Sequence, residues 1–71
     1  MNEMDELKRE IIATVSDLWM EYPDMRFGQL VTNVAFWAVG AKKSAAWDVT
    51  NEEFLTAAKN NLRRRRSSDG E

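Results

Sequence analysis

Apolar residues recur every three or four positions along the first third of the chain. This spacing places them on one face of an α-helix, which has about 3.6 residues per turn. The predicted helix covers residues 3–21 and ends before Pro23, because a residue that precedes proline is pushed out of the helical conformation. Ile12 and Trp19 flank this apolar stripe and widen it. The stripe itself consists of Met4, Leu7, Ile11, Val15, Leu18 and Tyr22.

A second helical pattern starts at the Pro23 corner and predicts a helix over residues 23–39. Proline suits the first turn of a helix, which favours this start. One broad face is apolar and Phe36 projects from the opposite side, so we expect this helix to be the central element. Gly28 and Ala35 form a track of small residues, which predicts a close crossing with a neighbouring helix.

A third helix has the clearest start in the sequence. Thr50 and Glu53 have the spacing of a capping box, in which each side chain accepts a hydrogen bond from the other residue's backbone N–H. The apolar spacing that follows predicts a helix over residues 50–64. Gly40 is the predicted C-terminal cap of the preceding helix, and residues 40–49 form the connection.

These elements predict an all-α fold: a small three-helix bundle with a disordered basic C-terminal tail. Residues 1–62 form the predicted domain, and residues 63–71 form a flexible tail because they are polar and have nothing to bury. No apolar run approaches the roughly 20 residues that span a bilayer, and no segment has the pattern of a signal peptide. A cytoplasmic location is therefore expected.

The composition removes most catalytic chemistries. The chain has no cysteine and no histidine, so thiolate and imidazole catalysis and ordinary zinc sites are excluded within one chain. No glycine-rich phosphate loop and no cluster of metal ligands is visible. The carboxylates of the first helix lie outside its apolar stripe, as expected for a solvated face. We therefore expect no enzyme activity, no cofactor and no bound metal.

Charge is distributed unevenly, although the net charge is only −2. Residues 1–24 hold seven acidic and two basic residues, whereas residues 63–66 are four consecutive arginines. The arginine run is either a solvated helix end that balances the acidic first helix, or a site that contacts nucleic-acid phosphates. The second alternative would use Lys42, Lys43, Arg63, Arg64, Arg65 and Arg66.

Three tryptophans, three phenylalanines and one tyrosine are many for so small an interior. Trp37 and Trp47 are assigned to the core, with Trp47 anchoring the 40–49 connection. Four other large apolar side chains are harder to bury at the same time. Either the third helix or the connection covers them, or they form a surface for a protein partner or a second copy of the chain. These candidates are Trp19, Met20, Met25 and Phe36.

The segment around the corner resembles a motif of short bacterial and phage proteins that reads Tyr-Pro-Asp-x-Arg-Phe-Gly-Gln-Leu. That group has no established activity, so the resemblance implies a helical fold and a bacterial or phage origin, and no mechanism. The residues that carry it are Leu18-Trp19, the run from Tyr22 to Asn33, Trp47-Asp48, and Glu52-Glu53-Phe54-Leu55.

The sequence therefore supports the hypothesis of a non-enzymatic small protein-interaction module. It would be a bacterial or phage accessory protein that binds or modulates a larger protein partner. The alternative is a nucleic-acid-associated accessory protein that uses its basic loop and arginine tail. Within the motif, Arg26 either binds a carboxylate or phosphate of a ligand or pairs with Asp24 or Glu21, and the structural role is favoured.

Overall fold

The computed structural model describes residues 3–69, and this part of the chain contains four helices and no strand. The helices are α1 (Glu3–Met20), α2 (Phe27–Val39), α3 (Ala45–Asp48) and α4 (Asn51–Asp69). The predicted all-α class is therefore confirmed, with one short helix, α3, in the connection where none was predicted. Within residues 3–69, no helix is long and apolar enough to cross a bilayer.

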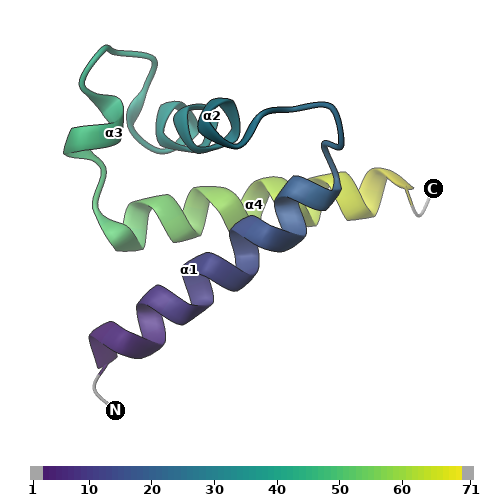
Figure 1. Ribbon diagram of the computed structural model, residues 1–71, viewed down its shortest axis with the longest axis horizontal. Coiled ribbons are helices and arrows are strands. Elements are labelled where there is room, and N and C mark those ends of the chain that lie inside the picture. Colours follow the sequence, from purple (N-terminus) through teal and green to yellow (C-terminus); the bar gives the residue numbers. More distant parts are fainter. Residues whose placement is uncertain (1–2, 70–71) are drawn as a thin grey trace.

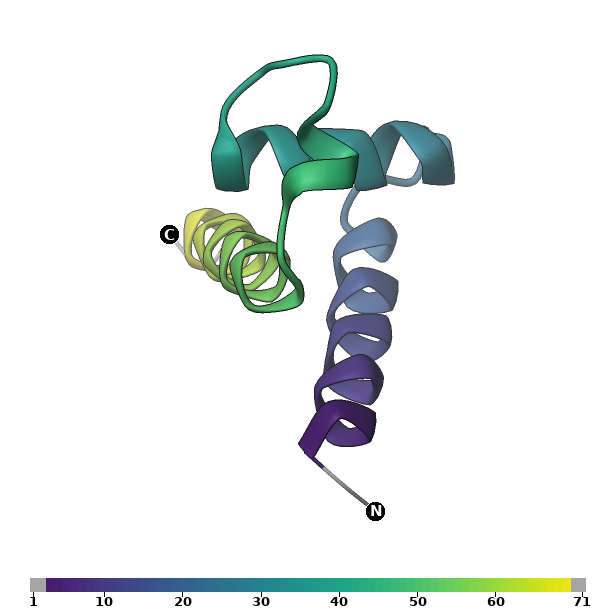
Figure 2. The same ribbon diagram turned by 90° about the vertical axis from the view of Figure 1, so that its left-hand side faces the viewer.

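Helix α4 is the central element, because it packs against both α1 and α2. In Figure 1, α1 crosses in front of α4, and α2 lies against another side of α4 with α3 beside α2. Figure 2 shows α2 crossing above α4 and near the C-terminal end of α1, with α3 packed beside α2. The predicted central position of the 23–39 helix is wrong, since the most extensive helix packing is that of α4 with α1 and with α2.

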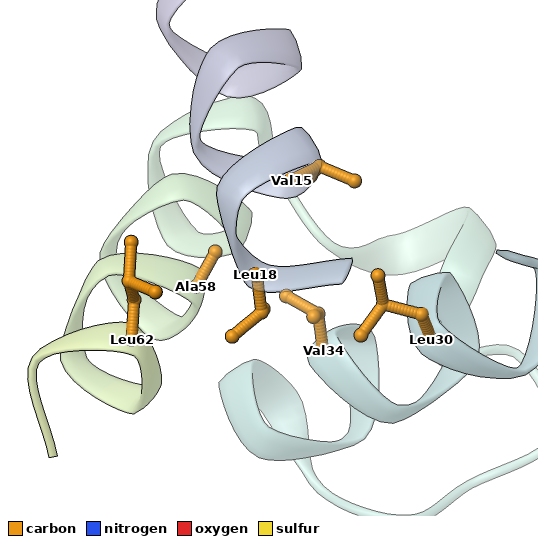
Figure 3. Packing of buried hydrophobic residues seen from close by; sticks show 6 residues of the cluster. All are labelled: Val15, Leu18, Leu30, Val34, Ala58 and Leu62. Carbon is orange, nitrogen blue, oxygen red and sulfur yellow. The ribbon is translucent and has the colours of Figure 1, made fainter. Parts of the chain in front are cut away.

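One cluster of aliphatic side chains joins α1, α2 and α4. Leu18, Leu30 and Val34 are fully buried, and they lie at the point where the three helices meet (Figure 3). The predicted apolar faces of all three helices supply this cluster, so their periodicity is confirmed at its centre. Its members are Val15, Leu18, Leu30, Val34, Ala58 and Leu62.

The corner between α1 and α2 is longer than the sequence predicted. Helix α2 begins at Phe27 rather than at Pro23, and residues 21–26 form a turn in which the Met25 N–H donates to the Tyr22 carbonyl at 3.0 Å. Arg26 has an extended backbone, with φ −73° and ψ 149°, and accepts the first helical hydrogen bond of α2. The fixed φ of proline suits a turn as well as a helix start, so Pro23 alone could not decide between them.

The third predicted helix extends further than expected. Helix α4 continues to Asp69, so most of the predicted flexible tail is helical, while residues 70 and 71 lie outside the described part of the chain. Basic side chains of α4 contact α1: Lys59 pairs with Glu10, and Arg66 lies 3.8 Å from the Asp17 carboxylate. The Arg66 contact joins the predicted tail to the acidic first helix.

Two predicted helix caps are present. The Thr50 N–H donates to Glu53 Oε1 at 2.9 Å, and the Glu53 N–H donates to Thr50 Oγ1 at 3.1 Å, which confirms the capping box. Gly40 caps α2 with a φ of 98°, a value that favours glycine. Gly28 has no such role, because a Cβ added there would meet nothing within 4 Å. The predicted close helix crossing at Gly28 is therefore wrong.

Two tryptophans assigned to the core lie at the surface. Trp47 is 90% exposed and Trp37 is 42% exposed. Ala45 of α3 is fully buried, and a residue two positions later on a helix points about 200° away from it. Burial of Ala45 therefore turns Trp47 toward solvent. Trp37 lies three residues after the buried Val34, at the edge of the α2 face that meets α4.

Candidate binding groove

An apolar groove lies between α1, α2 and the first turn of α4. Its volume is about 350 Å³, and Ser16 contributes the single polar side chain among the residues that line it. Helix α1 contributes Ile11, Ile12, Val15, Ser16 and Trp19, α2 contributes Phe27 and Val31, and α4 contributes Phe54. We refer to these eight residues as the apolar groove.

The α1 side of the groove follows from the helical repeat. Ile12 and Trp19 are seven residues apart, which is two turns, so they lie above one another beside the core stripe. The stripe itself packs against α4 and α2, and this flank is left at the surface. Ile12 is 69% exposed and Trp19 is 41% exposed.

The Trp19 indole is held in place by two contacts. Its Nε1–H donates a hydrogen bond of 2.7 Å to the Met25 carbonyl, and its ring lies 5.1 Å from the Phe27 ring at a tilt of 52°. Tilted aromatic pairs at this separation are favourable. Phe27 is 49% exposed, so the pair presents apolar surface that is already ordered. An ordered aromatic side chain loses little conformational entropy when it is buried by a partner.

The structure separates the four predicted interaction residues. Trp19 lines the apolar groove, and Met20 is 79% exposed but lies outside it. Met25 is half-buried against the core, and its sulfur accepts a hydrogen bond from Asn33 Nδ2 at 3.7 Å. Phe36 is half-buried on α2 and is not among the groove residues. Only Trp19 therefore belongs to the site that the structure assembles.

Seven of the eight groove residues were not interaction candidates from the sequence: Ile11, Ile12, Val15, Ser16, Phe27, Val31 and Phe54. Phe27 and Val31 belong to the broad apolar face that was assigned to the core. The flanking position of Ile12 and Trp19 beside the α1 stripe was the available signal, but no local pattern indicates which element would leave that flank uncovered.

The six basic candidates do not form one surface. Lys42 and Lys43 lie in the loop between α2 and α3, while the four arginines lie in the C-terminal half of α4, at the other end of the molecule in Figure 1. Four of the six contact the chain itself. Lys42 lies 3.4 Å from the Asp48 carboxylate, Arg63 donates to Asn60 Oδ1 at 3.1 Å, Arg65 contacts the corner, and Arg66 faces Asp17.

Arg65 joins the end of α4 to the α1–α2 corner. Its Nη2 donates a hydrogen bond of 2.8 Å to the Glu21 carbonyl, and its guanidinium carbon lies 4.5 Å from the centre of the Tyr22 ring. The Tyr22 hydroxyl in turn donates to Asn61 Oδ1 at 2.8 Å. At least one member of the arginine run thus has a structural role. Neither Lys43 nor Arg64 has a hydrogen bond or ion pair within the described residues.

One carboxyl group has a perturbed acidity. The Ser44 hydroxyl donates to Asp48 Oδ2 at 2.7 Å, and this hydrogen bond, together with that from Lys42, lowers the pKa of Asp48. Both groups stabilise the carboxylate form. Asp48 is exposed and lies in a four-residue helix, and within residues 3–69 no group of three acidic side chains is placed to hold a metal ion. The perturbation therefore marks a local structural contact.

Comparison of the chain with protein-family models, with curated proteins and with solved structures gave no match. The case for a site therefore depends on the geometry of the chain itself. Of the depressions lined by described residues, we take the apolar groove as the candidate site. It combines exposed large apolar side chains with an ordered aromatic pair.

Proposed function

We propose that this chain is a non-enzymatic protein-interaction module that binds an apolar segment of a larger protein in the apolar groove. The observation that carries the proposal is the ordered Trp19–Phe27 pair, which remains about half exposed at the edge of a groove with one polar side chain. Tryptophan is enriched among the residues that dominate binding energy at protein interfaces, particularly where neighbouring groups exclude water.

The free energy gained by covering the exposed groove side chains is large enough to support binding. A tryptophan side chain buries roughly 150–250 Å² in a core, so covering the exposed part of Trp19 removes on the order of 80 Å² from water and gains about 2 kcal/mol. Ile12 and Phe27 would add comparable amounts. The groove volume of about 350 Å³ lies near the lower end of the roughly 300–1,000 Å³ range of ligand sites.

The resemblance of the corner to bacterial and phage proteins supports the biological part of the proposal. The chain would be a cytoplasmic accessory protein of bacterial or phage origin that modulates a larger protein by occupying a surface. Such a task needs no catalytic group. A second copy of the chain is the other candidate partner for the same groove.

The test compares two matched variants of α1. Ile12→Glu places a charge in the groove, and Met20→Glu makes the same kind of change at a similarly exposed position outside it. A displayed library of random peptides about 15 residues long, or four helical turns, is selected against the wild-type chain and both variants. Wild type and Met20→Glu should enrich the same peptides, and Ile12→Glu should not. Equal enrichment by both variants would exclude the groove as the binding site.

A nucleic-acid role receives less support, because four of its six cations contact other residues of the chain and the cations are divided between two regions. Fluorescence titration with DNA and RNA at low and moderate salt tests it directly. Affinity that falls steeply with salt would favour this alternative. Sedimentation at high protein concentration tests self-association, which Ile12→Glu should weaken if a second copy occupies the groove.

A further inference from the structure

The charged residues that stand three or four positions from a groove residue within α1, α2 and α4 are all basic. On a helix, residues three and four positions apart are surface neighbours, with Cβ atoms about 5–6 Å apart. The charged residues in this relation to the α1 groove residues are Lys8 and Arg9. Both are neighbours of Ile12, the most exposed residue of the groove. Within α1, α2 and α4, no acidic residue stands three or four positions from any groove residue.

The acidic residues of α1 are directed elsewhere. Glu10 pairs with Lys59, and Asp17 faces Arg66, so this acidic side of the helix faces α4 rather than the groove. Asp5 lies one helical turn before Lys8 and Arg9, further from the groove. Although residues 1–24 have an excess of acids, the α1 edge of the groove is therefore basic. Glu53, which precedes the groove residue Phe54, accepts a hydrogen bond from the Thr50 N–H and lines a different depression.

The cations at this edge are available for a partner. Within the described residues, Lys8 and Arg9 are exposed and have no hydrogen bond or ion pair. Arg26 immediately precedes the groove residue Phe27 and is likewise exposed and unpaired in the described part, so the predicted pairing with Asp24 or Glu21 is absent there. Asp24 lines a different depression, together with Arg65.

We propose that the segment bound in the apolar groove is an acidic amphipathic helix of a protein partner. This inference depends on the proposed function and specifies the chemistry of the partner. Apolar side chains of the helix occupy the groove at the spacing of one helical face. Aspartate and glutamate residues beside them face Lys8, Arg9 and Arg26. Charges at the edge of an interface act mainly on the rate of association and on the choice of partner.

The experiment selects from the same peptide library and then reverses the charge of the groove edge. Peptides enriched by the wild-type chain should combine aliphatic or aromatic residues at helical spacing with a net negative charge. The double variant Lys8→Glu/Arg9→Glu should bind these peptides about tenfold more weakly at moderate salt and should instead enrich basic peptides. Affinity of the wild-type chain should fall as salt rises, because exposed charges are screened over about 10 Å at 0.1 M salt.

The control is Arg63→Glu/Arg64→Glu, which reverses two consecutive cations on α4. These positions lie nine and ten residues after Phe54, about 14 Å along the helix. This double variant should retain the acidic peptides with affinity close to that of wild type. Circular dichroism of each variant shows that it remains helical. An equal loss of affinity in both double variants would mean that total charge, and not the groove edge, attracts the peptides.

The remaining outcomes separate this inference from the proposed function. Peptides that need Ile12 but are neutral or basic would overturn the acidic partner and leave the protein-interaction function in place. Absence of any peptide that depends on Ile12 would overturn both. A dimer that Ile12→Glu disrupts and Met20→Glu does not would identify a second copy as the occupant, which also overturns the inference.

Discussion

Replacing Arg65 by alanine should destabilise the fold, whereas the same replacement at Arg64 should have little effect. The two residues are neighbours on α4 and have the same intrinsic helix propensity. Arg65 donates to the Glu21 carbonyl at 2.8 Å and lies over the Tyr22 ring, and Arg64 has no such contact in the described part of the chain. The comparison therefore measures the contact between the end of α4 and the α1–α2 corner.

The magnitude follows from the two contacts of Arg65. A hydrogen bond from a charged donor contributes about 1.5–3 kcal/mol, and its exposure here favours the lower end of that range. A cation–π contact at an exposed site adds about 0.5–1 kcal/mol. Ordering the long side chain offsets part of this sum, so the expected loss is about 1.5 kcal/mol. For a domain of this size, 1 kcal/mol shifts the melting temperature by about 4–8 °C, which gives a decrease of roughly 10 °C.

Urea and thermal unfolding followed by circular dichroism measure both variants. Arg65→Lys provides an intermediate case, because it retains the charge over Tyr22 but cannot reproduce the planar guanidinium. Equal stability of Arg65→Ala and Arg64→Ala would refute the reasoning. Arg65 would then have no measurable structural role, and the nucleic-acid alternative would gain weight.

Three other predictions concern local structure. Gly28→Ala should stabilise the fold by up to about 0.5–1 kcal/mol, because the added methyl meets nothing, whereas Gly40→Ala should cost about 1–3 kcal/mol at its positive φ. Thr50→Ala should cost about 1 kcal/mol in urea unfolding through loss of the cap. In an NMR titration, the pKa of Asp48 should lie below the ordinary aspartate range and should rise in Ser44→Ala. Since folding lowers this pKa, the ionised carboxylate stabilises the fold at pH values above the ordinary aspartate pKa. This contribution to stability is lost as the pH falls through the lowered pKa.

Features determined by neighbours along the chain could be predicted from the sequence. The capping box of Thr50 and Glu53 involves residues three positions apart, and both of its hydrogen bonds are present. The apolar faces that supply Leu18 and Leu30 to the core follow from the helical repeat alone. The positive φ of Gly40 likewise reflects the local requirement of a helix end.

Features determined by distant residues could not be predicted in this way. Arg65 contacts Glu21 and Tyr22, more than 40 positions earlier in the chain, and no local pattern indicates that pairing. The exposure of Trp47 depends on which side of α3 packs against the rest of the protein, and a four-residue helix has too few apolar positions to show it. Large aromatic residues are therefore poor markers of the core in so small a domain.

The candidate groove lies where the sequence prediction of α2 failed. With a helix start at Pro23, Phe27 would belong to the second turn and would have a helical turn packed before it. Because α2 starts at Phe27 itself, a turn precedes it, and the Met25 carbonyl of this turn accepts the hydrogen bond of the Trp19 indole. Phe27 then meets Trp19 at the surface instead of entering the core. The flank of α1 beside this late helix start is exposed at Ile12 and Trp19. This flank, with the basic pair Lys8 and Arg9 that precedes it, forms the surface that we propose to bind a partner.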